Sequence, residues 1–128
     1  MEVEKIQLLF DNKEQAKSYL SLLRRVRTNE LDRPCRRAIC YLISLNGITR
    51  RHADEIFDFE HDRIAFEWYK REWQNENTMK LSQLVANLYN GACNGEPRDY
   101  SPYKLFRCKY AAQMLIAVKI ALCEWINE

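Results

Sequence analysis

Four side chains near the middle of the sequence are of the types that bind metal ions or transfer protons. They are two histidines and two carboxylates, His52, Glu55, His61 and Asp62. The histidines are nine residues apart, and neither begins an HExxH motif or another paired spacing that places two ligands on one zinc ion. His52 has carboxylates nearby and is a candidate general base, but no nucleophile elbow, phosphate-binding loop or triad signature accompanies it. We therefore expect no metal, no cofactor and no catalytic residues here.

Arginine has the most distinctive distribution of any residue type in the chain. It accounts for twelve of the twenty basic residues, and its guanidinium group binds carboxylates and phosphates through two parallel hydrogen bonds. The first three arginines also complement the negative C-terminal end of a predicted helix, which is a purely structural explanation for them. Eight arginines lie between residues 24 and 51, and these are the predicted partner-binding residues: Arg24, Arg25, Arg27, Arg33, Arg36, Arg37, Arg50 and Arg51.

An acidic run follows the arginines directly. Residues 1–51 carry a net charge of +5, residues 52–77 carry −5 and residues 78–128 carry +2, so the overall +2 hides a segregated distribution. Segregation of this kind predicts two surface patches of opposite sign. The acidic run is a possible second binding patch, or it pairs with the arginines inside the monomer, and both interpretations stay open. It consists of Asp54, Glu55, Asp58, Glu60 and Asp62.

The elements that would position these side chains are helices. Hydrophobic periodicity predicts helices over residues 12–26, 33–46, 49–58, 78–90, 102–108 and 110–126. Residues 60–77 are irregular and predict one short helix or a packed loop. The first helix has an apolar stripe made by Ala16, Tyr19, Leu20, Leu23 and Val26. The last helix has a core face made by Met114, Leu115, Val118, Leu122 and either Trp125 or Ile126.

The helix predicted over residues 33–46 is amphipathic on a helical wheel. Tyr41 lies at its flank, close to the arginines. The inward face consists of Cys35, Ala38, Ile39, Leu42 and Ile43. The outward face consists of Arg33, Arg36, Arg37, Cys40 and Ser44, so we expect a basic surface along this helix.

Aromatic side chains provide a second type of candidate contact, because tyrosine and tryptophan are common anchors in protein interfaces. Trp68 and Tyr69 lie in the irregular segment, among charged residues. Together with Tyr41 they are possible aromatic anchors. Trp73 lies in the same segment, and we interpret it as a core residue.

Length and composition favour one helical domain over residues 1–128. The chain has 128 residues, enough to bury a hydrophobic core. Three glycines and three prolines leave little room for the turns of a β-sandwich or barrel. We therefore predict an all-α fold, a compact bundle of five or six short helices around one core.

Cysteine usage and hydropathy favour a cytoplasmic protein. The five cysteines are an odd number without a CxxC motif, which is typical of reduced thiols. The first ten residues lack the features of a signal peptide. No apolar stretch is long enough to span a membrane, so we expect no membrane association.

Several short motifs resemble a known family. They are HADEIFDFE, the Trp73–Gln74 pair, LYNG and YSPYKLF, spread over residues 33–110. The sequence resembles a family of small uncharacterised helical proteins from Firmicutes and their prophages. The resemblance implies a compact helical fold and a phage or prophage setting. It implies no catalytic residues.

These observations favour a non-catalytic binding protein. By analogy with other small phage proteins, we expect an anti-CRISPR-like inhibitor of a host defence system. Its partner would be a host protein that handles nucleic acid, such as a CRISPR effector, with direct nucleic-acid contact left open. One alternative is a DNA-binding regulator whose helices over residues 33–46 and 49–58 form a helix-turn-helix. A second is a sponge for a nucleotide signal, with Tyr41 and arginines holding the phosphate near a helix N-terminus.

Overall fold

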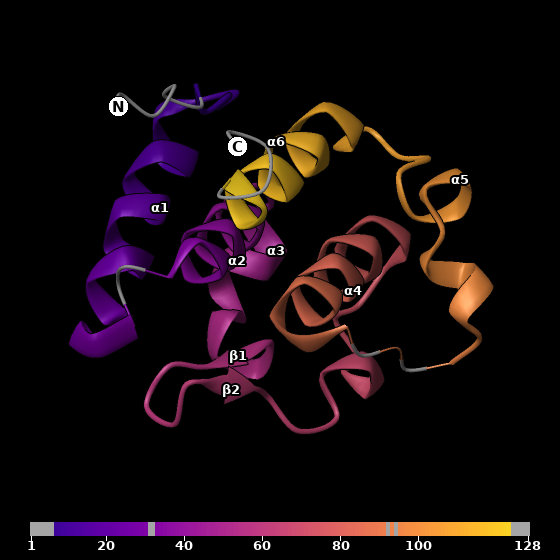
Figure 1. Ribbon diagram of the computed structural model, residues 1–128, viewed down its shortest axis with the longest axis horizontal. Coiled ribbons are helices and arrows are strands. Elements are labelled where there is room, and N and C mark those ends of the chain that lie inside the picture. The colour runs from indigo at the N-terminus through magenta and orange to yellow at the C-terminus, as the bar shows by residue number, and fades with distance from the viewer. Residues whose placement is uncertain (1–6, 31–32, 92, 94, 124–128) are drawn as a thin grey trace.

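A central helix organises the molecule. The computed structural model describes residues 7–30, 33–91, 93 and 95–123, and Figure 1 shows the arrangement of the elements. Helix α2 (Pro34–Ser44) lies between α1 (Lys13–Arg25), α4 (Glu76–Asn90) and α6 (Ala111–Ala121) and packs against all three. Two shorter helices, α3 (Gly47–Arg51) and α5 (Pro102–Leu105), complete the set of α-helices among the described residues. The predicted all-α fold of five or six short helices is confirmed, with one small two-stranded hairpin as an addition.

Helix α2 is buried on all sides along most of its length. Every side chain from Ala38 to Leu45 is at most 2% exposed. A helix covered by three neighbours has no solvent face, so the prediction that Cys40 and Ser44 point outward is wrong. The Ser44 hydroxyl donates to the carbonyl oxygen of Tyr41 at 2.6 Å, which satisfies its polar group inside the core.

The buried stripe of α1 differs from the predicted one by a rotation of the helix. Asn12 caps α1 by accepting from the backbone N–H of Gln15 at 3.0 Å. The buried side chains are Gln15, Tyr19 and Leu22, whereas Leu20, predicted to be in the core, is 54% exposed. Only one side of α1 faces α2, so a stripe through Leu22 places Leu20 on the solvent side.

The last helix is also less buried than its apolar sequence predicts. Met114 and Ala117 face α2, but Leu115 and Leu122, predicted core residues, are exposed. Among the described residues, helix α6 packs mainly against α2 and less extensively against α4, so part of its surface stays exposed. Trp125 and Ile126, the alternative ends of the predicted core face, lie outside the described residues.

The prediction of a helix over residues 49–58 is wrong for the second half of that range. Asn46 caps α3 by accepting from the backbone N–H of Ile48 at 2.7 Å, and α3 ends at Arg51. A 3-10 turn, Ala53–Glu55, follows. Strands β1 (Phe57–Asp58) and β2 (Arg63–Ile64) then form an antiparallel hairpin with Phe57 opposite Ile64. Alternation in the sequence FDFE buries Phe57 and Phe59 on one side, as the pleat of a strand requires.

Helix α4 begins earlier than the sequence predicted. Asn75 accepts from the N–H of Thr78 at 3.0 Å, and the Thr78 hydroxyl accepts from the N–H of Asn75 at 2.7 Å. This reciprocal pair is a capping box, so the predicted cap at Asn77 or Thr78 is two to three residues late. Short 3-10 turns, Thr28–Glu30, Trp68–Lys70 and Pro97–Tyr100, connect the remaining elements. Among the described residues, no helix combines the length and hydropathy needed to cross a membrane.

The end of α4 depends on the conformation of one glycine. Gly91 has φ +78°, and a Cβ atom built there meets nothing within 4 Å. Gly91→Ala is therefore expected to destabilise the fold by about 1–2 kcal/mol through backbone conformation alone. Gly95→Ala is the matched control, because the space around Gly95 is also open and its φ is not in the left-handed region. Urea unfolding of both variants tests this, and equal stabilities would contradict it.

Candidate functional site

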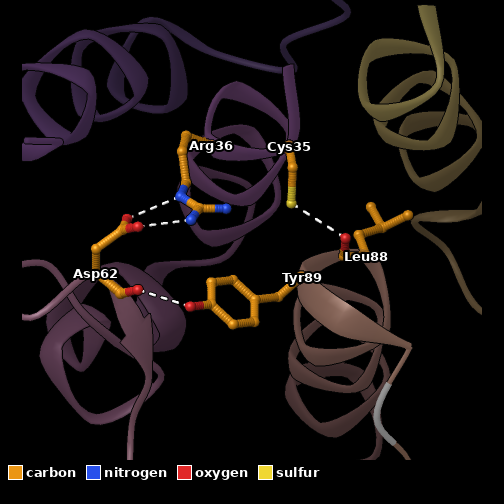
Figure 2. A network of polar contacts seen from close by, with 5 residues as sticks. All are labelled: Cys35, Arg36, Asp62, Leu88 and Tyr89. Carbon is orange, nitrogen blue, oxygen red and sulfur yellow. Dashed lines mark hydrogen bonds and ion pairs between the residues drawn. The ribbon is translucent and has the colours of Figure 1, made fainter. Parts of the chain in front are cut away.

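A buried ion pair joins the central helix to the hairpin. Arg36 is 5% exposed, and its Nε and Nη2 atoms donate to the two carboxylate oxygens of Asp62 at 2.8 Å and 2.6 Å (Figure 2). Burial alone would lower the pKa of Arg36, but the hydrogen bonds and the charge of Asp62 outweigh it and raise the pKa. Arg36 therefore stays charged inside the protein. The prediction that Arg36 belongs to an exposed basic face is wrong, and Asp62 pairs within the monomer.

Helix α4 closes this network from the other side. The hydroxyl of Tyr89 donates to the backbone oxygen of Asp62 at 2.7 Å, and the Arg36 guanidinium lies 4.7 Å from the centre of the Tyr89 ring. The Cys35 thiol points toward the backbone oxygen of Leu88 at 3.1 Å, and burial raises the pKa of this thiol (Figure 2). Asp62 itself has φ +53°. The network connects α2, the hairpin and α4, so its role is structural.

Two more of the predicted binding arginines are committed to internal contacts. Arg25 forms an ion pair with Asp54, and its guanidinium lies 4.5 Å from the centre of the Phe59 ring. These contacts fix the end of α1 against the hairpin. Arg50 is half-buried and donates from Nη1 to the backbone oxygen of Ser44 at 2.8 Å.

The remaining arginines are concentrated where α1 ends and α2 begins. Arg24, Arg27 and Arg33 are exposed, Arg37 is half-buried, and Arg51 is exposed on α3. Within the described residues, Arg24, Arg27 and Arg51 form no ion pair. Sequence reasoning explained Arg24 as a partner for the negative end of α1. Arg33 is the N-cap of α2, so its charge lies at the positive end of that helix dipole.

Most of the acidic run is paired inside the chain. Besides Asp54 and Asp62, Asp58 accepts from the ring Nδ1 of His61 at 2.8 Å and lies 3.5 Å from Arg63 Nε. A backbone hydrogen bond from His61 is the main cause that lowers the pKa of Asp58. Glu60 is exposed. The acidic residues therefore do not form one continuous patch available to a partner.

His52 and Glu55 form a half-buried pair. The ring Nδ1 of His52 lies 2.5 Å from Glu55 Oε2, and Arg71 Nη1 lies 3.6 Å from Glu55 Oε1. The hydrogen bond with His52 is the main cause that lowers the pKa of Glu55. The His52 ring stacks on Trp73, with centroids 4.7 Å apart and planes 8° apart. The buried Trp73 Nε1 forms no hydrogen bond within the described part of the chain.

This pair resembles the histidine–carboxylate part of a proton-transfer site, since a carboxylate on Nδ1 orients an imidazole. The stacking on Trp73 gives it an equally good structural role, closing the core beside α4. Within the described ranges, no group of three or more His, Cys, Asp or Glu side chains is arranged to hold a metal ion. The sequence grouped His52 and Glu55 among four possible metal ligands, but it did not predict the stacking of His52 on Trp73.

The aromatic anchors are placed differently from the predictions. Tyr41 is fully buried, its hydroxyl donates to the backbone oxygen of Leu9 at 2.7 Å, and burial raises its pKa to about 12. Trp68 is also buried. Both predictions of an exposed anchor are therefore wrong, whereas Tyr69 is partly exposed. Phe66, which was not among the predicted anchors, is 82% exposed.

The comparison with known families decides where this chain belongs. A model of a family of unknown function matches residues 5–128. The chain belongs to DUF6075. The match extends over nearly the whole sequence, well beyond the motifs within residues 33–110. No curated protein and no solved structure shows significant similarity to it.

Helices α2 and α3 of this DUF6075 protein do not present a recognition helix. In a helix-turn-helix the second helix enters the major groove, but α3 has only five residues and Thr49 at its centre is fully buried. The Thr49 hydroxyl donates to the backbone oxygen of Ile43 at 2.7 Å. Arg50 is folded back on Ser44. This arrangement does not favour the DNA-binding regulator.

An open groove of about 510 Å³ lies between α4 and the segment containing α5 in this DUF6075 protein. Its cations already have partners: Lys80 lies 3.5 Å from Glu76, Lys104 lies 3.2 Å from Asp99, and Arg107 stacks on Tyr103. Paired cations are poor ligands for a phosphate. Tyr41, where the nucleotide-sponge alternative placed the phosphate, is buried in the core, so neither place favours that alternative. The groove is lined by Glu76, Lys80, Gln83, Asp99, Tyr103, Lys104 and Arg107.

Proposed function

We propose that this protein is a non-catalytic binding protein that docks on an acidic protein surface. The docking site consists of Arg24, Arg27 and Arg33, which we call the arginine surface. The observation that supports the proposal is the concentration of exposed guanidinium groups at the end of α1 and the start of α2. The proposed setting is a phage or mobile element of Firmicutes. The proposed partner is a host protein that handles nucleic acid, such as a CRISPR effector.

The charge at the N-terminal end of α2 supports an acidic partner surface. A helix N-terminus has unpaired N–H groups and a partial positive charge, so acidic residues usually occupy its first turn. The first turn of α2 contains no acidic residue, and Arg33 is its N-cap without a side-chain capping bond. Burial of Arg36 against Asp62 neutralises one positive charge, whereas Arg24 and Arg27 are exposed and form no ion pair within the described residues. A carboxylate surface on a partner would be attracted by these exposed arginines and by the positive N-terminal end of α2.

A protein partner fits better than bare nucleic acid. Asp54 is largely exposed beside Arg25, and Glu60 is exposed in the hairpin. Phosphate groups would be repelled by these carboxylates. A protein surface offers both signs of charge and can match a mixed surface. Nucleic-acid binding is therefore the competing outcome of the test.

The test is capture of partners by the tagged protein from a Firmicutes lysate, with and without nuclease. We expect a protein partner that survives nuclease and whose capture falls about tenfold or more in the triple variant Arg24→Glu, Arg27→Glu, Arg33→Glu, because charge reversal repels an acidic surface. The control variant Arg98→Glu, Lys109→Glu, Lys119→Glu changes the net charge equally at exposed positions outside α1 and α2. It should retain capture.

Two results would contradict the proposal. Capture that survives the triple reversal would exclude the arginine surface as the docking site. Capture that disappears with nuclease would mean that nucleic acid is the ligand. Circular dichroism of both variants separates loss of binding from loss of fold.

A further inference from the structure

We infer that the segment around Phe66 is a second contact with the protein partner, in which Phe66 inserts into an apolar pocket with an acidic rim. This inference rests on the proposed binding function and adds a site on a different part of the chain. Phe66 is the most exposed of the large hydrophobic side chains described. It follows strand β2 and precedes the 3-10 turn Trp68–Lys70.

The backbone on both sides of Phe66 is fixed. Before it, Ile64 packs against the core, and the N–H of Ala65 donates to the backbone oxygen of Ile56 at 2.9 Å, which extends the hairpin. After it, Trp68 is buried. In a short flexible loop, a phenylalanine could fold back onto the protein surface. Here the fixed residues on both sides keep the Phe66 side chain exposed to solvent. An aromatic side chain ordered before binding loses less entropy when it enters a pocket.

The backbone conformation of Glu67 gives a second sign of function. Glu67 has φ +53°, a left-handed conformation that is rare outside glycine, asparagine and aspartate. The N–H of Lys70 donates to the Glu67 backbone oxygen at 2.9 Å, so a hydrogen-bonded turn maintains this conformation. Strained positions of this kind are concentrated at binding and catalytic sites. Here the strained residue directly follows the exposed aromatic ring.

The charges around Phe66 indicate the chemistry of the partner. Three ion pairs lie in or beside this segment, and in each the cation is more exposed than its carboxylate. The side-chain exposures are 66% against 27% for Arg63–Asp58, 62% against 41% for Lys70–Glu67, and 41% against 35% for Arg71–Glu55. Exposed Glu60 and Glu72 lie outside this stretch in the sequence. The segment therefore presents an exposed aromatic ring that is flanked along the chain by cations more exposed than their carboxylate partners. An apolar pocket with an acidic rim is the complement of such a segment.

Site-specific photocrosslinking in Firmicutes cells tests the inference. The probe p-benzoylphenylalanine replaces Phe66 in one variant, Arg27 in a second and Tyr103 in a third. Tyr103 is the matched control, because it is an exposed aromatic residue in the groove beside α4 and lies outside both proposed contacts. We expect crosslinking to one protein at positions 66 and 27, about tenfold above position 103, because contacts at the centre of an interface are close and ordered.

The crosslinked peptide and a charge reversal make the result specific. The partner peptide joined to position 66 should contain apolar and acidic residues. Crosslinking at position 66 should fall about tenfold when Arg63→Glu and Lys70→Glu are added, and should persist with Arg98→Glu and Lys119→Glu.

Crosslinking at 27 but not at 66 would overturn the inference and leave the arginine surface intact. Crosslinking at 66 but not at 27 would support the Phe66 contact and contradict the arginine surface as a docking site. Crosslinking at neither position would contradict both contacts. Crosslinking at 66 to nucleic acid or to a second copy of this chain would also overturn the inference.

Discussion

Replacement of Arg36 by methionine is expected to lower the free energy of unfolding by about 3–5 kcal/mol, because it leaves the Asp62 carboxylate buried without a counter-charge. The two side chains are 6% and 11% exposed and form two parallel hydrogen bonds. Methionine keeps most of the length of the arginine stem, so the loss would come from the missing charge rather than from a large cavity. Urea unfolding followed by circular dichroism measures it.

Two control variants test whether the loss of stability comes from the buried ion pair or from the loss of any arginine charge. Arg24→Met removes an exposed arginine and should change stability by less than about 0.5 kcal/mol. The double variant Arg36→Met, Asp62→Asn should be more stable than the sum of the two single changes, because it removes both charges of the pair. Asparagine tolerates the left-handed conformation of residue 62. A loss below about 1 kcal/mol in Arg36→Met would mean that water reaches the pair.

Replacement of Tyr41 by alanine is expected to cost about 3–5 kcal/mol, the range for removing a large buried aromatic side chain. The Tyr41 ring contacts Phe10 at 5.5 Å and Tyr19 at 6.2 Å between centroids, so it holds the start of the described chain and α1 against α2. Thermal and urea unfolding measure the loss. Tyr41 was predicted to be an interface anchor. If it had that role, its replacement by alanine would reduce partner capture without reducing stability.

Two further variants complete the test of Tyr41. Tyr41→Phe removes only the hydroxyl that donates to the Leu9 backbone oxygen and should cost about 1 kcal/mol. Tyr103→Ala removes an exposed ring and should be nearly neutral. If Tyr41→Ala were as stable as Tyr103→Ala, the central position of Tyr41 in the core would be refuted.

The helical elements were predictable where local signals agree. In α4 the spacing of Leu81, Leu84 and Val85 predicts a buried face, and Gly91 ends the helix as expected. Ser101 followed by Pro102 correctly predicted the start of α5. These signals act within one or two turns of the chain, so sequence alone contains them.

The candidate site was less predictable, because burial depends on residues distant in the sequence. A helical wheel places Arg36 on the polar face of α2, but Asp62 lies 26 residues further along the chain. Local periodicity cannot show that three helices cover α2. The exposure of Phe66 was missed for the same reason, since an aromatic residue in an irregular segment has no period that assigns it to either side.

The position of α2 also determines when the protein can fold during its synthesis. Helix α2 is synthesised well before one of its three neighbours, α6, which begins only at residue 111. Until then the apolar side chains of α2 lack part of their cover, and chains elongate at roughly 5–20 residues per second. The nascent chain therefore exposes apolar side chains of α2 for several seconds. Completion of α6, rather than formation of any earlier helix, ends the period in which chaperones can bind these side chains or the chain can aggregate through them.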